Sequence, residues 1–404
     1  MMNKLITFKD LITYASNLIG GNYVPFLVNE INTEYVNEII KNSKADKSNE
    51  KKNHKLELYN QLKKTYGHDR DLYLTSSGRG ALYMILKNLN LSKNSEIIIP
   101  SYSCFGLIQP ILSLKLTPHF IDVNVDLNPS FESVKKAINS NTKVVIVPHL
   151  GGTFASDLFE IMDFCKKRGI CVIEDCCQAF GLKFKNKNVG LFADISFFSS
   201  GEGKPVFTPE GGWIVIKKKK RFKIEYLEEE SEKISLRNFK KFNARFPTNY
   251  SHAIMNRLFE HFKSLLPDYD KIAYSDKSLK TFDYEKKLSN LAAALISFEL
   301  RKIDQNLYNR EKLAKFWIKN SKKNGLRFLN TKNSIFNKLF VESSFLQKKK
   351  LIIKGLQVEN GYKPLHLRYD FDKYPRVDLN NTNYMWKKIY SLPVRPSLNI
   401  NNII

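Results

Sequence analysis

Short apolar runs alternate with amphipathic stretches through the first half of the chain. Runs of strand length are followed by stretches in which apolar residues recur at helical spacing. The predicted strands are Leu72–Leu74, Glu96–Ile99, His119–Val123, Val144–Val147, Ile170–Glu174, Ile195–Phe198 and Trp213–Ile216. The predicted helices between them are Gly80–Leu89, Phe105–Leu112, Phe131–Ile138 and Leu158–Lys167. This repeated β-α-β order predicts an α/β fold, in which helices cover both faces of a mostly parallel sheet in three layers.

The pattern changes on either side of this region. Asn42–His54 is polar and predicts an exposed loop, and the regular alternation stops after Lys220. Leu288–Ile303 predicts a long helix, and the residues after it suggest a smaller α+β domain. We therefore divide the chain into an N-terminal helical segment with a polar insertion (1–70), a large domain (71–285) with a long insert near 226–288, and a helix with a small C-terminal domain (286–404).

Length and composition are those of a globular protein. The chain has 404 residues, of which 43% are hydrophobic and 26% are charged, an ordinary balance. No uninterrupted apolar run has the length needed to cross a bilayer. Lys9 and Asp10 interrupt the apolar N-terminal stretch, so a signal peptide is not expected. The predicted location is the cytoplasm, with no membrane span.

The chain is strongly basic, with a formal net charge of +25. Nucleic acid or an anionic membrane surface would suit such a charge. The lysines are scattered, however, and the runs Lys217–Lys220 and Lys348–Lys350 are short. We therefore expect no nucleic-acid partner, and steeply salt-dependent binding to nucleic acid would contradict this. A basic surface would also attract anionic substrates such as nucleotide sugars.

The five cysteines are Cys104, Cys165, Cys171, Cys176 and Cys177. An odd number with two adjacent members does not match a secreted disulfide framework. The group from Cys165 to Cys177 lacks the paired C-x-x-C knuckles of structural zinc sites. Buried thiols are the favoured interpretation, and no metal site is predicted.

Four segments place chemically useful residues at the ends of predicted strands, where ligands bind in open α/β sheets. In the first segment a strand runs into Ser76, Ser77 and Gly78, and a helix starts at once. Backbone N–H groups at a helix start bind phosphate, and Arg79 would add a charge-assisted contact. A plain N-capped helix would give the same pattern.

The other three segments supply an acid, a lysine and aromatic rings. Asp175 ends a buried strand and needs a partner such as a protonated ring nitrogen, unless it caps a helix. Lys204 lies in a glycine-rich turn, where desolvation would lower its pKa and favour a Schiff base with an aldehyde. A surface lysine is the alternative. Pro100–Gly106 carries aromatic residues that would stack on a flat heterocycle or pack into the core.

The order of these segments resembles the DegT/DnrJ family of sugar aminotransferases, which are pyridoxal-phosphate enzymes of fold type I. The resemblance is close over Leu72–Ile216 and looser over Leu288–Arg310 and Lys363–Leu398. LSNLAAALISFEL looks like the family's interface helix, and SLPVRPSL resembles its C-terminal signature. The other matching motifs are SSGRGAL, IIIPSYSCFG, FIDVN, VIEDCCQAFG and VGLFADISFFSSGEGKP with the later EGGW.

The resemblance implies a role for each matching residue. Lys204 would hold pyridoxal 5'-phosphate as a Schiff base and then move protons, and Asp175 would pair with the ring nitrogen. Gln178 would lie against the ring or its phenolic oxygen. The phosphate ligands would be Gly78, Ser199 and the backbone amides of Arg79 and Gly80, which stand where the family usually has Thr-Ala.

The chain departs from the family's pattern at further positions. Alignment gives Cys104 where the family often stacks a Trp or Phe, so Tyr102 or Phe105 would take that role. The family commonly places an Asn of the neighbouring subunit near the phosphate, and Glu285 aligns with it. A glutamate would repel phosphate, so either the register differs or this dimer builds its site differently. His366 would approach the substrate or pack in the core.

We therefore expect a pyridoxal-phosphate-dependent aminotransferase that moves an amino group to a nucleotide-linked keto-sugar, in surface polysaccharide or amino-sugar biosynthesis. Glutamate is the expected donor and a homodimer the expected assembly, both by resemblance. Lys204 argues against the family's dehydrases, in which His replaces the lysine. The alternatives are a pyridoxal-phosphate enzyme with another substrate class and a non-catalytic relative that serves as a regulator or assembly subunit.

Overall fold

A computed structural model of the chain describes residues 31, 34–39, 53–218, 222–225, 228–229, 231–245, 283–320, 326–342, 344, 358–368 and 370–395. Most of the predicted polar loop (42–52) and much of the predicted insert (246–282) lie outside the described residues. Of that loop, Asn53 caps the first turn of α3 and His54 begins the helix. None of the described helices is long and apolar enough to cross a membrane.

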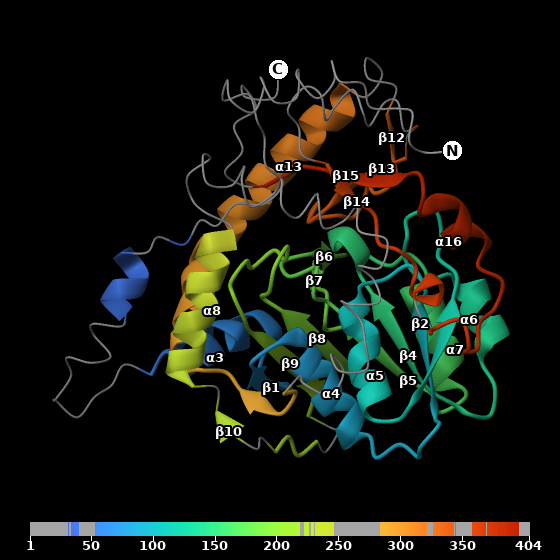
Figure 1. Ribbon diagram of the computed structural model, residues 1–404, viewed down its shortest axis with the longest axis horizontal. Helices are drawn as coiled ribbons and strands as arrows, with labels where there is room; N and C mark the ends of the chain where they lie inside the picture. Colours follow the sequence, from blue (N-terminus) through green and yellow to red (C-terminus); the bar gives the residue numbers. More distant parts are fainter. Residues whose placement is uncertain are drawn as a thin grey trace.

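A seven-stranded sheet in the order β1-β9-β8-β5-β4-β2-β3 forms the centre of the large domain (Figure 1). Neighbouring strands from β3 to β8 run parallel, whereas β9 is antiparallel to both β8 and β1. β9 reverses because residues 200–211 return the chain without the helix that a parallel crossover needs. The strands are β1 (Arg70–Thr75), β2 (Glu96–Pro100), β3 (Thr117–Ile121), β4 (Thr142–Pro148), β5 (Cys171–Asp175), β8 (Ile195–Ser199) and β9 (Gly212–Lys217).

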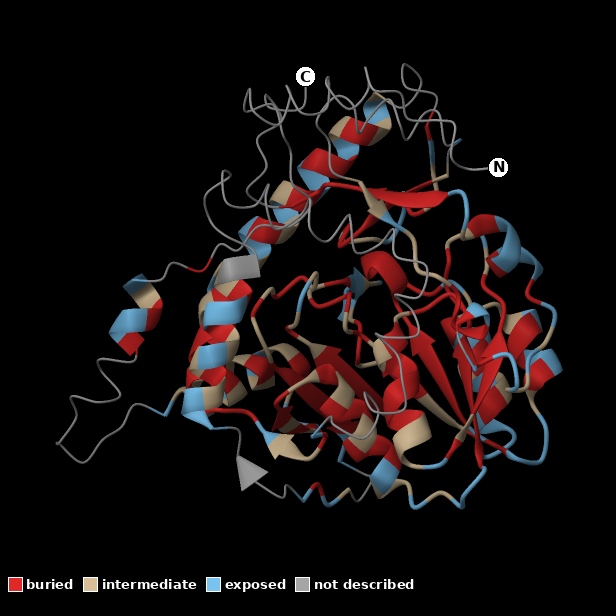
Figure 2. Cartoon of the chain, in the orientation of Figure 1, coloured by how far each residue is buried: buried red, intermediate tan, exposed pale blue. Residues whose placement is uncertain are grey.

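Helices cover both faces of this sheet, which confirms the predicted three layers. Alternate residues of β4 show the division: Val144 and Ile146 face one core and Val145 and Val147 face the other. The first core includes α4 (Gly78–Asn88) and α5 (Ile108–Ser113). The second includes α3 (His54–Tyr66), α6 (Phe131–Ala137), α7 (Leu158–Lys166) and α12 (Asn290–Arg301). The strands between the layers are almost wholly buried (Figure 2).

A second sheet, antiparallel and in the order β12-β13-β15-β14, lies above the large sheet beside α13 in Figure 1. Its own core includes residues of α13, which fits the predicted smaller α+β domain. The elements here are α13 (Ile303–Lys319), β12 (Arg327–Phe328), β13 (Leu339–Glu342), β14 (Glu359–Asn360), α16 (Asn380–Met385) and β15 (Ile389–Leu392). The remaining elements are β6 (Lys183–Phe184), β7 (Lys187–Asn188), β10 (Glu228–Glu229), α8 (Glu232–Arg245) and β11 (Lys286–Lys287).

Candidate active site

The turn between β1 and α4 brings a helix N-terminus against the end of β8. Ser77 caps α4, because its hydroxyl accepts a hydrogen bond from the Gly80 amide at 3.0 Å. A Cβ added to Gly78 would lie 2.7 Å from the Cβ of Ser199, closer than real side chains approach. Only glycine therefore permits this contact. The helix start and the Ser199 hydroxyl together offer donors to an anion.

The two residues that follow Gly78, Arg79 and Gly80, contact different parts of the chain. The Gly80 amide already donates to Ser77, and a Cβ at this position would lie 2.7 Å from the carbonyl oxygen of Tyr284. Gly80 therefore packs against the segment at Tyr284. Arg79 extends along Gly106, and its Nη1 donates to Oε1 of Gln109 at 2.9 Å. Burial lowers the pKa of the Arg79 guanidinium, which still carries its charge at neutral pH.

Asp175 is the last residue of β5. Its Oδ1 accepts a hydrogen bond from the Cys177 amide at 3.0 Å, and its carbonyl oxygen accepts one from the His149 amide at 3.0 Å. These contacts fix the carboxylate at the carboxyl edge of the sheet. The adjacent Cys177 thiol stays protonated at neutral pH, because burial and the charge of Asp175 raise its pKa well above the usual range.

Lys204 lies in the connection between β8 and β9. Its amide donates to the Gly201 carbonyl at 3.2 Å, and Nδ2 of Asn337 holds the preceding Gly203 carbonyl at 3.0 Å. The expected lowering of its pKa was wrong in sign. Burial does lower the pKa of the Lys204 ammonium, but the surrounding acidic groups outweigh it and the pKa is raised. Those groups are Cys104, Cys177, Tyr362 and Asp175.

One cavity of about 680 Å³ brings the predicted residues together. Its wall also includes Cys104 and Gln109, and its size lies in the range of small-molecule sites. Of the predicted residues, Gly78, Arg79, Phe105, Asp175, Gln178, Ser199 and Lys204 line this cavity and Gly80 does not.

Gln178 and Phe105 line the cavity, and contacts with other parts of the chain hold both side chains in place. Oε1 of Gln178 accepts from the Gly151 amide at 2.9 Å, and its Nε2 donates to the Tyr362 hydroxyl at 2.9 Å. The Phe105 ring stacks on Phe371, with centroids 5.9 Å apart and planes 6° from parallel. Phe105 is thus largely held by core packing.

The segment before α12 holds Glu285 away from this chain's cavity. Glu285 forms an ion pair with Lys87 and does not line the cavity. Asp283, two residues earlier, does line it, and its carboxylate pairs with Lys286 at 3.3 Å. Tyr284 stacks on Tyr83 at 4.7 Å and anchors the segment. The role of Glu285 toward a neighbouring subunit stays a prediction, and Asp283 is a lining residue that sequence reasoning missed.

His366 is a packed histidine. Its Nδ1 lies 2.6 Å from the Ser101 hydroxyl and its Nε2 lies 3.1 Å from Oδ1 of Asn383. Because the amide oxygen of Asn383 only accepts, Nε2 donates and Nδ1 accepts from Ser101. Burial lowers the pKa of His366, so the neutral ring is favoured. His366 does not line the cavity.

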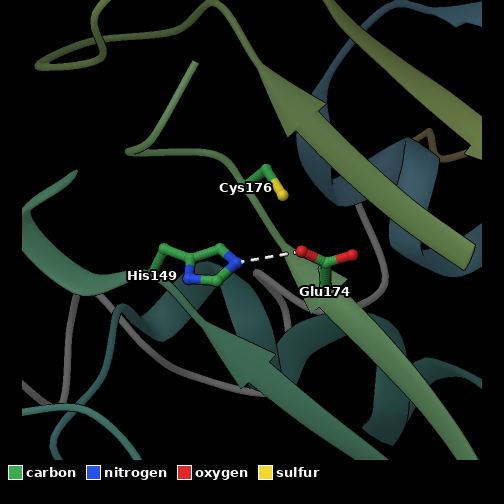
Figure 3. Close-up of side chains that lie close together, drawn as sticks. All are labelled: His149, Glu174 and Cys176. Atoms are coloured by element: carbon green, nitrogen blue, oxygen red, sulfur yellow. Dashed lines mark hydrogen bonds and ion pairs between the residues drawn. The ribbon is translucent and has the colours of Figure 1, made fainter. Parts of the chain in front are cut away.

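A second group of polar side chains, His149, Glu174 and Cys176, is buried, and the ring of His149 points toward the Glu174 carboxylate (Figure 3). Glu174 accepts from the Ala193 amide at 2.6 Å, from the Gly190 amide at 2.9 Å and from His149 Nε2 at 3.1 Å. Nδ1 of His149 accepts from the Ala155 amide at 3.1 Å. Both ring nitrogens and both carboxylate oxygens are therefore engaged, and the group holds the ends of β4 and β5 in place.

The sequence profile of the DegT/DnrJ/EryC1/StrS aminotransferase family matches residues 28–404. The chain belongs to this family. The match includes every residue of the cavity described above.

Two relatives within the family show the range of sequence similarity. A GDP-perosamine synthase of Escherichia coli O157:H7 is 37% identical over 141 residues, which are 35% of this chain and 38% of that protein. The chain thus aligns with little more than a third of the length of this relative. A UDP-4-amino-4,6-dideoxy-N-acetyl-beta-L-altrosamine transaminase of Campylobacter jejuni is 28% identical over 344 residues, which are 80% of each chain.

Solved structures share the fold at low identity. An aminotransferase of Helicobacter pylori involved in the biosynthesis of pseudoaminic acid has a TM-score of 0.70 at 20% identity, covering 94% of this chain and 96% of that one. A Bacillus subtilis protein, solved with its bound cofactor PMP, has a TM-score of 0.69 at 20% identity, covering 94% of this chain and 82% of that one. The fold is that of fold type I aminotransferases.

Proposed function

We propose that the protein is a pyridoxal-phosphate-dependent aminotransferase that transfers an amino group, from glutamate, to a nucleotide-linked keto-sugar. The observation that carries the proposal is the shared cavity of Lys204 and Asp175 beside the start of α4. An amine, an acid and an anion site in one cavity are the three features that a phosphorylated pyridine aldehyde needs. Family membership and the relatives' names support the same reaction class.

The residues present suit that cofactor. The Asp175 carboxylate, fixed by the Cys177 amide, would hold a protonated ring nitrogen. Gly78 leaves the start of α4 open to a phosphate, Ser199 would donate its hydroxyl and Arg79 would add a positive charge. When bound, the cofactor supplies an electron sink and a carrier for the amino group.

Lys204 is the group placed to hold the cofactor and to move protons. Lys204 lines the cavity, so its amine would meet a ligand that binds there. The pKa of Lys204 is raised, so the amine is protonated at neutral pH when the acidic side chains of the site are the only groups around it. Neutralising the charge of Asp175 would therefore ease the loss of that proton.

The substrate class rests on charge and on relatives. A net charge of +25 attracts anions, and a sugar linked to a nucleotide carries a diphosphate. The names of these two relatives contain a GDP-linked and a UDP-linked sugar. We assign this chain to the same class of keto-sugar, and to surface polysaccharide or amino-sugar biosynthesis.

Two further assignments belong to this proposal. We expect a homodimer, because sites of this fold type lie at dimer interfaces, and sedimentation equilibrium would measure it. We expect a reducing compartment such as the cytoplasm, because all five cysteines are free thiols. A monomer at working concentration would contradict the first assignment.

Borohydride reduction tests the proposed function. The protein is incubated with pyridoxal 5'-phosphate, reduced, digested and mapped by mass spectrometry. The label is expected on Lys204, and Lys204→Ala should abolish it while Lys338 stays unlabelled in both proteins. Absence of label on Lys204 would contradict the proposal and favour the non-catalytic alternative. Donors are then screened by half-reaction, and keto-sugars against the aminated form.

A further inference from the structure

The side-chain amide of Gln178 is clamped at both ends. Its oxygen accepts from the Gly151 amide at 2.9 Å, and one hydrogen of its Nε2 goes to the Tyr362 hydroxyl at 2.9 Å. Rotating the amide by half a turn would place nitrogen against the Gly151 amide, so this orientation is fixed. Gln178 lines the cavity. Its second Nε2 hydrogen is therefore available to an acceptor that binds there.

Tyr362 is held by residues of both domains. Its ring meets Tyr102 edge to face, with centroids 5.9 Å apart, and the Lys338 ammonium lies 4.9 Å from its centroid. Lys338 is paired with Glu359, and a Cβ on Gly361 would collide with the Tyr102 hydroxyl. The backbone at 361 thus lies directly against Tyr102, and these contacts restrain the ring of Tyr362.

We propose that Tyr362 is a positioning residue, which acts through Gln178 to hold an N–H donor toward the phenolic oxygen of the cofactor. The inference rests on the proposed function, because it needs the cofactor in this cavity. Its physical basis is the set of contacts at Gln178: the Gly151 amide fixes the oxygen, the Tyr362 hydroxyl takes one Nε2 hydrogen, and the other hydrogen is left for a ligand of the cavity. Tyr362 of the small domain thereby orients the side-chain amide of Gln178, which belongs to the large domain.

A double-mutant cycle of Tyr362→Phe and Gln178→Met tests this relation. The phenylalanine keeps the ring but removes the acceptor, and the methionine keeps the length but removes the donor. We measure the affinity of the cofactor-free protein for pyridoxal 5'-phosphate by equilibrium dialysis. Tyr362→Phe is expected to weaken it about 2- to 10-fold, the effect of one neutral hydrogen bond. In the Gln178→Met background the same change should cost less than about 2-fold.

A spectroscopic readout separates positioning from simple support of the fold. A hydrogen bond to the phenolic oxygen stabilises its negative charge, so losing it raises the pH midpoint of the bound cofactor's visible absorbance. Both single variants should raise that midpoint by about 0.3 to 1 pH unit. Tyr73→Phe is the matched control, because its hydroxyl donates to the Phe222 carbonyl at 3.1 Å, away from the cavity. It should leave the midpoint unchanged.

The outcomes distinguish this inference from the proposed function. Fold-losses in cofactor affinity that multiply in the double variant would overturn the role of Tyr362, and so would an unchanged midpoint in Tyr362→Phe. Borohydride labelling of Lys204 would still support the aminotransferase in either case. Failure of the wild-type protein to bind the cofactor would overturn both. Non-additive effects with a raised midpoint support the inference.

Discussion

At the scale of single residues, the hydrogen atom that serves as the side chain of Gly78 decides how closely α4 approaches β8. The Gly78→Ala variant should be destabilised by about 1–3 kcal/mol, because its methyl group would lie 2.7 Å from the Cβ of Ser199 and 3.3 Å from the Cys177 sulfur. It should also bind pyridoxal 5'-phosphate more weakly. Urea unfolding and equilibrium dialysis measure the two effects.

Gly201→Ala provides the control for this prediction. The nearest atom to its added Cβ is the Ser199 hydroxyl oxygen at 3.4 Å, an ordinary contact. Stability should change by less than about 0.5 kcal/mol. Equal destabilisation of both variants would mean that the close approach of Gly78 to Ser199 is not the cause of the stability loss in Gly78→Ala.

Arg79 offers a second prediction at this scale. Replacing it with alanine should weaken cofactor binding about 10-fold or more, because a charge-assisted hydrogen bond to phosphate is lost. Arg168→Ala removes the same charge from an exposed position and serves as the control. An Arg79→Ala variant with wild-type affinity at matched ionic strength would exclude Arg79 as a phosphate ligand.

The residues of the site were more predictable than their electrostatics. Strand ends and glycines mark Asp175, Gly78 and Lys204 in the sequence, because ligands gather where parallel strands end. The sign of the pKa shift of Lys204 was not predictable, since it depends on which acidic groups the fold brings around the amine. Asp283 was missed for a similar reason: its place in the wall depends on how the segment packs on α4.

At the scale of elements, α12 depends on its first turn. Ser289 caps it by accepting from the Ala292 amide at 3.0 Å, and its hydroxyl also bonds to Ser235 of α8 at 2.7 Å. Ser289→Ala should therefore cost about 0.5–2 kcal/mol of unfolding free energy, or more because the site is fully buried. Urea unfolding followed by circular dichroism measures it.

The same helix supplies the matched control. The hydroxyl of Ser297 is buried and has no hydrogen-bond partner within the described residues. Ser297→Ala removes a polar group that gains nothing from burial, so stability should stay the same or rise. If both serine variants lose the same free energy, capping is not the reason for the loss at Ser289.

Elements were predicted well and their pairing was not. All seven strands of the large sheet match apolar runs in the sequence, because a buried strand needs such a run on both faces. Their order is set by contacts between distant segments: β1 pairs with β9, where Leu72 faces Val215. The periodicity of apolar residues is local and does not encode that pairing. It therefore predicted a mostly parallel sheet but neither the position nor the direction of β9.

At the scale of the whole molecule, a histidine is one of the contacts between the large domain and the C-terminal part of the chain. His366 belongs to the segment before α16, yet its ring accepts from Ser101 of the large domain while donating to Asn383. Leu365 adds a backbone hydrogen bond to the Ser101 carbonyl at 2.8 Å. Both side-chain contacts use the neutral ring, in which Nδ1 accepts from Ser101, and protonation would reverse that hydrogen bond and place a charge on a buried ring.

This contact predicts how stability depends on pH. Burial lowers the pKa of His366 in the folded protein, and the nearby Arg376 lowers it further, against opposing effects of Asn383 and Asp122. The contribution to stability is therefore complete above the unfolded value of about 6.5 and is lost as the pH falls below it, because the unfolded chain then takes up a proton that the folded chain resists.

The Tm should accordingly fall between about pH 7.5 and pH 5.5, and the fall should be smaller in His366→Gln, which has no proton to gain in that range. The glutamine variant should start from a lower Tm at the higher pH, since its amide cannot replace both contacts. His68→Gln removes an exposed histidine and should keep the wild-type slope. A slope in His366→Gln equal to that of the wild type would show that this histidine does not couple the contact between the two domains to pH.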